Sequence, residues 1–199
     1  MLIGLPAGVA LVVLSEALLA TLLQYGEFTP RDVEMAGKSL VAFSLGLPAL
    51  ILVKVLTPGF YARQDTKTPA KIAVISVGVN ILFSLLLVMP MAHTGLALAL
   101  TISAYVNVGL LYHTLKKQGV YQLHTGWLAF FIKVVAACSG MGALLIVFTG
   151  ELSLWIDASL LERVSRLSIL ILAGALVYFL LVFLLRIPVK AMLRESRTK

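Results

Sequence analysis

Six long apolar stretches, separated by short polar segments, dominate this chain of 199 residues. A helix crosses the hydrocarbon layer of a membrane with roughly 20 mostly apolar residues, because each residue rises about 1.5 Å. A transmembrane barrel would instead show shorter segments of alternating hydrophobicity. The predicted fold class is therefore an all-α polytopic membrane protein. Its six expected spans are Leu2–Leu23, Leu40–Tyr61, Ile72–Met89, Gly95–Leu115, Trp127–Phe148 and Leu167–Leu185.

Composition supports this class. Hydrophobic residues make up 60% of the chain and charged residues 13%, whereas about a quarter of a soluble domain is charged. The net charge of +7 lies in short loops and at the C-terminus, so nucleic acid is not an expected partner. The single cysteine, Cys138, lies in an apolar stretch and is predicted to be a small core residue.

The polar segments differ in charge. Lysine and arginine concentrate in the segment between the second and third spans, in the segment between the fourth and fifth, and in the basic tail, residues 186–199. Because these residues accumulate on the cytoplasmic side of membrane proteins, we expect those segments and the C-terminus to be cytoplasmic.

Two polar side chains interrupt the apolar spans. Lys54 lies inside the second span, where it either snorkels to the interface or faces a water-filled cavity that attracts an anion. Asn80 lies in the middle of the third span, where an amide more often bonds a neighbouring helix than an ion.

Two further features predict breaks in the helices. Pro58 and Gly59 should bend or end the second span, as a functional hinge or as a break that neighbouring helices repair. Glu16 interrupts the first span, so Ala17–Tyr25 is expected along the membrane surface. The span before Glu16 is short, which suggests that the chain is the C-terminal part of a longer protein.

A polar cluster follows the predicted break. Arg63, Gln64, Asp65 and Lys67 lie just beyond Pro58, and arginine and lysine are the side chains that bind phosphate. They form either a substrate-binding or gating segment, together with Lys54, or an ordinary positively charged cytoplasmic loop.

The string VKVLTPGFYARQDTKTP, which contains this cluster, resembles the cytoplasmic segment of the MurJ (MviN) family of bacterial lipid II flippases. QYGEFTPRDV resembles that family's outer loop after its ninth helix, and LVAFSLGLPALILVK resembles its tenth helix. The resemblance implies the C-terminal lobe, about helices nine to fourteen, of a flippase of the MOP exporter superfamily. It further implies that Trp127–Phe148 and Leu167–Leu185 form a hydrophobic groove for a polyprenyl tail, and that Asn80 contributes to a sodium site.

The implied function is alternating-access transport of lipid-linked peptidoglycan precursor across the bacterial cytoplasmic (inner) membrane. The implied partners are this polyprenyl-pyrophosphate lipid, membrane lipids and an N-terminal lobe outside this chain. No cofactor is expected beyond coupling to sodium or to the membrane potential. The alternatives are another exporter of the superfamily, for drugs or oligosaccharide lipids, and a non-transporting scaffold or fragment. An enzyme is not expected, because no nucleophile–base set, carboxylate pair or His/Cys cluster has useful spacing.

Overall fold

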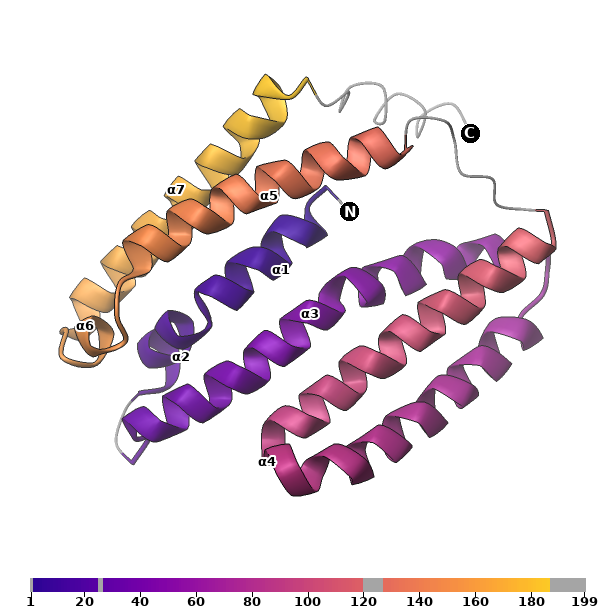
Figure 1. The fold of residues 1–199 in the computed structure, drawn as a ribbon, viewed down its shortest axis with the longest axis horizontal. Helices are drawn as coiled ribbons and strands as arrows, with labels where there is room; N and C mark the ends of the chain where they lie inside the picture. Colours follow the sequence, from indigo (N-terminus) through magenta and orange to yellow (C-terminus); the bar gives the residue numbers. More distant parts are fainter. Residues whose placement is uncertain (1, 25–26, 120–126, 187–199) are drawn as a thin grey trace.

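The computed structural model describes residues 2–24, 27–119 and 127–186, and these residues form helices and no strands (Figure 1). The predicted tail beyond Arg186 lies outside the described residues, as does the segment 120–126. The helices are α1 (Gly4–Val13), α2 (Ser15–Leu23), α3 (Pro30–Tyr61), α4 (Lys67–Lys117), α5 (Trp127–Thr149), α6 (Ser153–Ile156) and α7 (Leu160–Leu184).

All six predicted apolar spans are helical. Among the described residues, α3, α4, α5 and α7 are long and apolar enough to cross a membrane, and α1 with α2 would add a broken span. Many large apolar side chains face outward, among them Val74 at 72% exposure and Met89 at 91%. Exposed apolar area on this scale suits lipid and not water as the surrounding solvent. The chain is a multi-pass membrane protein.

The helix α4 contains two of the predicted spans. It reverses direction at Ala92, whose φ of 47° and ψ of −123° are not helical. A Cβ atom on Gly95 would lie 2.3 Å from the carbonyl oxygen of Leu87, so the close return of the chain requires glycine there. The two arms, 67–91 and 93–117, then run side by side (Figure 1).

Three helices begin earlier than hydrophobicity predicts, because polar residues cap them. The side chains of Thr29 and Asp32 form a reciprocal capping box at the start of α3, with Pro30 in the first turn. Ser159 and Glu162 form the same device at the start of α7. The start of α4 at Lys67 moves this residue from the predicted loop into a helix.

The first predicted span, Leu2–Leu23, is not one helix. It bends by 71° between α1 and α2, at Leu14 and two residues before Glu16. The prediction of a break near Glu16 is therefore confirmed. Helix α2 buries Ala17, Ala20 and Thr21 against its neighbours. A position of Ala17–Tyr25 along the membrane surface stays a prediction.

The helix α3 does not end at Pro58, one of the two outcomes predicted there. The helix α3 continues through Pro58 and Gly59 to Tyr61, and the backbone N–H of Ala62 still donates to the Pro58 carbonyl at 3.0 Å. Proline removes one backbone donor, but the buried side chains of Leu56 and Phe60 hold this turn against α4. A hinge function for Pro58 and Gly59 stays a prediction.

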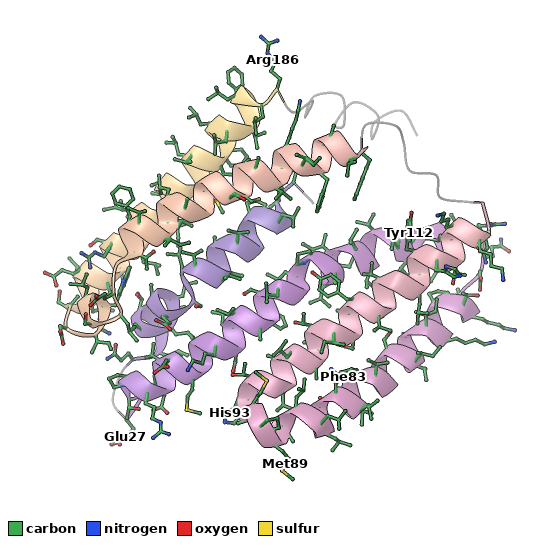
Figure 2. The ribbon with its side chains drawn as sticks, in the orientation of Figure 1. Glu27, Phe83, Met89, His93, Tyr112 and Arg186 are labelled. Atoms are coloured by element: carbon green, nitrogen blue, oxygen red, sulfur yellow. The ribbon has the colours of Figure 1, made fainter. Side chains whose placement is uncertain are left out.

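Two buried clusters organise the helices. One joins α1, α2, α5, α6 and α7 with Val33 at the start of α3, and the other packs the second half of α3 against both ends of α4. Helix α1 lies between α3 and α5 and connects the two groups (Figure 1). Glu27 and His93 lie at one end of the molecule, and Tyr112 and Arg186 lie at the opposite end (Figure 2). The polar segments thus alternate between the two ends, as the predicted topology requires.

Candidate functional site

The predicted site lies in the link between α3 and α4. The backbone N–H of Asp65 donates to the Phe60 carbonyl at 3.1 Å, and that of Gln64 to the Tyr61 carbonyl at 2.9 Å. This pair of bonds is a Schellman motif, in which the residue at the position of Gln64 adopts a left-handed conformation. Gln64 has a φ of 59°. Glycine usually occupies that position, so the backbone of Gln64 is strained.

Asp65 has a local partner. Its Oδ1 accepts a hydrogen bond from the backbone N–H of Thr68 at 3.0 Å, in the first turn of α4. Hydrogen bonds from Thr68, its side chain first and then its backbone, lower the pKa of this carboxyl group. Asp65 is thus an ionised cap on α4. The carboxylate favours the sharp reversal from α3 to α4 whether or not it also contacts a substrate.

The remaining predicted residues are exposed cations. Arg63 and Lys67 flank the turn, and Lys54 lies about 13 Å before Arg63 along α3. The structure therefore brings Arg63, Gln64, Asp65 and Lys67 together in one tight link and leaves Lys54 at a distance. These cations make no ion pair within the part of the chain that the structure describes.

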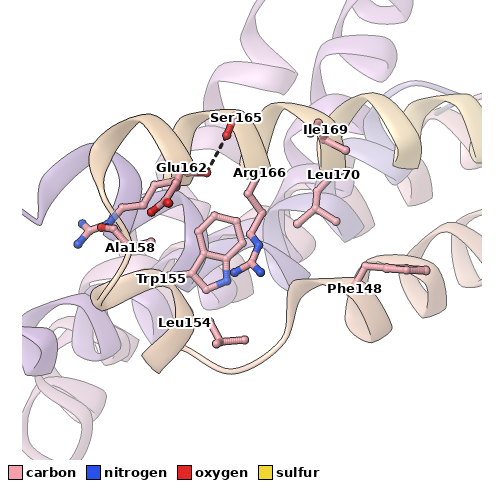
Figure 3. Close-up of a pocket in the computed structure, with 10 residues that line it drawn as sticks. Phe148, Leu154, Trp155, Ala158, Glu162, Ser165, Arg166, Ile169 and Leu170 are labelled. Atoms are coloured by element: carbon pink, nitrogen blue, oxygen red, sulfur yellow. Dashed lines mark hydrogen bonds between the residues drawn. The ribbon is translucent and has the colours of Figure 1, made fainter.

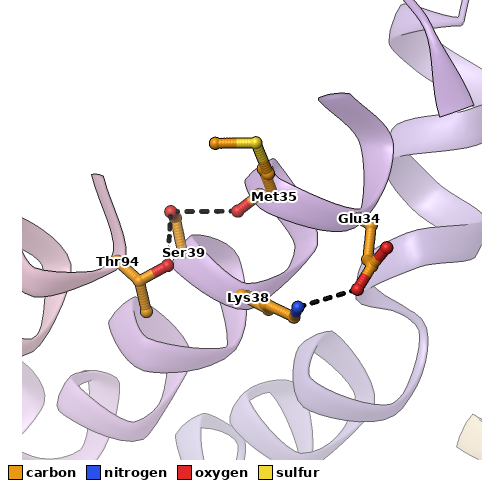
Figure 4. A network of polar contacts seen from close by, with 5 residues as sticks. All are labelled: Glu34, Met35, Lys38, Ser39 and Thr94. Carbon is orange, nitrogen blue, oxygen red and sulfur yellow. Dashed lines mark hydrogen bonds and ion pairs between the residues drawn. The ribbon is translucent and has the colours of Figure 1, made fainter. Parts of the chain in front are cut away.

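The opposite end of α3 carries a different polar group. Lys38 Nζ donates to Glu34 Oε1 at 2.7 Å, and the hydroxyl groups of Ser39 and Thr94 lie 3.4 Å apart (Figure 4). The Ser39 contact joins α3 to the second arm of α4. The exposed ion pair contributes little energy.

Asn80 lies half-buried on the first arm of α4. A hard cation takes several oxygen ligands, and the Asn80 amide supplies one. Among the described residues, no group of three His, Cys, Asp or Glu side chains could hold a metal ion. The fit of this chain alone to a sodium ion is therefore incomplete, and Asn80 can be only part of such a site.

An apolar cavity lies where the groove was predicted. It has a volume of about 210 Å³ and lies between α1, α5 and α7. Met141 and Leu145 of α5 and Gly174 and Tyr178 of α7 line it. The sequence predicted a groove formed by α5 and α7, but residues of α1 also line the cavity. The Tyr178 hydroxyl donates to the Leu2 carbonyl at 2.6 Å. An apolar lining of this kind suits a hydrocarbon chain.

One structurally important residue was missed. Arg163 falls between the fifth and sixth predicted spans, but in the structure it lies in the first turn of α7 and is only 9% exposed. Its guanidinium donates to the carbonyl groups of Ala158 at 2.9 Å, of Ala20 at 3.0 Å and of Ile156. Arg163 therefore joins α2, α6 and α7. The S-x-x-E capping pattern of Ser159 and Glu162 would have placed it on a helix, but not in the interior.

The arrangement of α1 to α7 matches known proteins. The family model described as lipid II flippase MurJ matches residues 1–185. This chain belongs to the MurJ family.

The curated relatives of this MurJ-family chain agree with that assignment. A probable lipid II flippase MurJ of Haemophilus influenzae is 41% identical over 177 residues, covering 89% of this chain and 34% of the relative. The probable lipid II flippase MurJ of Vibrio cholerae is 37% identical over 188 residues, which cover 94% of this chain and 36% of the relative. The chain thus spans about a third of the length of these relatives.

The fold of the MurJ-family chain also has a solved counterpart. A structure of lipid II flippase MurJ in an inward closed conformation superimposes with a TM-score of 0.76 at 24% identity. The match covers 93% of this chain and 36% of that one. It shows that the helices from α1 to α7 have the fold of the corresponding part of that structure.

Proposed function

We propose that this chain is the C-terminal portion of a flippase for lipid-linked peptidoglycan precursor. The family match over residues 1–185 carries the proposal, together with the names of the curated relatives. The whole protein would work by alternating access, with an N-terminal lobe outside this chain. Transport of this kind moves an intact molecule and breaks no covalent bond, so the protein is a transporter and not an enzyme.

The cavity between α1, α5 and α7 supports a role in holding the polyprenyl tail. Its lining is almost entirely apolar, and two of the helices that line it, α5 and α7, are long enough to cross a membrane. A tail bound there stays in a hydrocarbon environment, so only the pyrophosphate headgroup has to cross the membrane centre. That step carries the large desolvation cost of a charge.

The exposed cations Lys54, Arg63 and Lys67 would contact the headgroup at the cytoplasmic side. This placement requires the link between α3 and α4 to be cytoplasmic, as the distribution of lysine and arginine favours. The C-terminus would then also be cytoplasmic, in the inner membrane of a bacterium. Coupling to sodium, in part through Asn80, or to the membrane potential would supply the energy.

The test uses the full-length protein in cells depleted of their own flippase. Ala175 lines the apolar cavity, so Ala175→Phe should fill it and reduce the precursor exposed in the outer leaflet. Leu176→Phe is the matched control, because Leu176 is 67% exposed and lies outside the lining. Full rescue of growth and of outward precursor by Ala175→Phe would contradict the role of the cavity. Failure of the wild-type protein to restore outward precursor would contradict the transport function itself.

A further inference from the structure

A second cavity lies at the end of the molecule where α5, α6 and α7 meet, and the proposed transport does not use it (Figure 3). Its volume is about 670 Å³. Ser165 and Arg166 line its polar side, and Phe148 and Ile169 line its apolar side. Both apolar side chains are 65% exposed. The cavity therefore has a polar and an apolar part within one turn of α7.

Arg166 is the cation of this cavity that is free to bind a ligand. Its guanidinium carbon lies 5.7 Å from the ring centroid of Trp155. Trp155 is 1% exposed, and its Nε1 donates to the Thr149 carbonyl at 2.9 Å, so the ring is a fixed platform. No acceptor among the described residues bonds the N–H groups of Arg166. A guanidinium has five such donors and matches the oxygens of a phosphate group.

The other charged groups of the lining are already engaged. Each of the three guanidinium nitrogen atoms of Arg163 donates a hydrogen bond to a backbone carbonyl group. The negative charge of Glu162 would repel an anionic ligand. However, its carboxylate accepts a hydrogen bond from the backbone N–H of Ser159 at 2.9 Å and so caps α7. With two arginines and one glutamate, the lining carries a net positive charge. The balance favours an anionic ligand at Arg166.

The position of the cavity identifies the class of ligand. Arg166 follows Glu162 and Ser165 in the first turns of α7, and from Ile169 to Leu172 the helix carries only apolar side chains. A tryptophan and an arginine at such a boundary lie at the level of the lipid headgroups. We propose that this cavity binds an anionic phospholipid, with Arg166 on the phosphate group and the acyl chains along Phe148 and Ile169. The proposal depends on the membrane-spanning helices and not on the transport reaction.

Fluorescence quenching tests this proposal. In the full-length protein, every tryptophan except Trp155 is replaced by phenylalanine, and nanodiscs of phosphatidylcholine receive increasing fractions of phosphatidylglycerol brominated on its acyl chains. We expect saturable quenching of Trp155, normalised to unbrominated lipid. Arg166→Gln should require about tenfold more phosphatidylglycerol for half-quenching, as expected for the loss of a charge-assisted hydrogen bond. Arg166→Lys should give an intermediate value.

Arg31→Gln is the matched control, because Arg31 is an exposed arginine at the same end of the molecule and does not line the cavity. Its quenching curve should superimpose on that of the unsubstituted protein. Identical curves for Arg166→Gln and the unsubstituted protein would overturn the proposal. Recovery of Trp155 emission in excess inorganic phosphate would show that the site takes free phosphate and not lipid, which would overturn it as well. An unchanged unfolding temperature checks that Arg166→Gln leaves the fold intact.

Discussion

Replacement of Arg163 should destabilise the packing of α2, α6 and α7 more than replacement of any exposed arginine. The guanidinium makes three hydrogen bonds to backbone carbonyl groups, at 2.9 Å to Ala158, at 3.0 Å to Ala20 and a third to Ile156. A hydrogen bond to a charged group contributes about 1.5–3 kcal/mol, and contributions within one network do not add fully. Burial of the charge offsets part of this gain. We therefore expect Arg163→Ala to lower the free energy of unfolding by about 2–4 kcal/mol.

The geometry of the three bonds makes a second variant informative. Arg163→Lys keeps the charge, but a compact ammonium group cannot reach three carbonyl groups that the planar guanidinium spans. It should recover less than half of the loss. The assay is reversible denaturation of the full-length protein in detergent micelles, with Arg31→Ala as an exposed control. Surface substitutions usually change the free energy of unfolding by no more than about 0.5 kcal/mol. If the free energies of unfolding of Arg163→Ala and Arg163→Lys both stayed within that range of the unsubstituted protein, the assignment of Arg163 as a link between helices would be refuted.

Three further predictions concern the contacts of α3 and α4. Gln64→Gly should stabilise the protein by about 0.5–1 kcal/mol in the same denaturation assay, because Gln64 has a φ of 59°, and a destabilised variant would contradict the strain. The pKa of Asp65 is lowered in the folded state, so its contribution to stability is present above the unfolded pKa and is lost as pH falls through the folded value. The stability difference between the unsubstituted protein and Asp65→Asn, measured from pH 7 down to pH 3, should shrink toward acid pH, and a constant difference would contradict the capping role. Thr101→Val removes the 2.7 Å hydrogen bond to the Ala42 carbonyl and should cost about 0.5–1.5 kcal/mol by denaturation, whereas Thr114→Val, which loses only a bond within its own helix, should cost less.

The candidate site was only partly predictable from the sequence. The residue types Arg63, Asp65 and Lys67 identified the segment, because arginine and lysine cluster beside an apolar span. The left-handed backbone of Gln64 was not predictable, since glutamine rarely adopts it and the surrounding Schellman bonds impose it. The continuation of α3 past Pro58 has a similar cause. Proline disfavours a helix locally, but the packing of Leu56 and Phe60 against α4 outweighs one lost hydrogen bond.

Hydrophobicity along the chain was enough to determine the helices and their membrane setting, because a lipid environment forces each long apolar stretch to satisfy its own backbone hydrogen bonds. The motif between the second and third spans was also enough to indicate the family. Only the tertiary structure decided the 71° bend at Leu14, the reversal at Ala92 and the buried position of Arg163. These features depend on contacts between residues far apart in the chain, such as Arg163 with Ala20, and no local pattern of residues encodes such a contact.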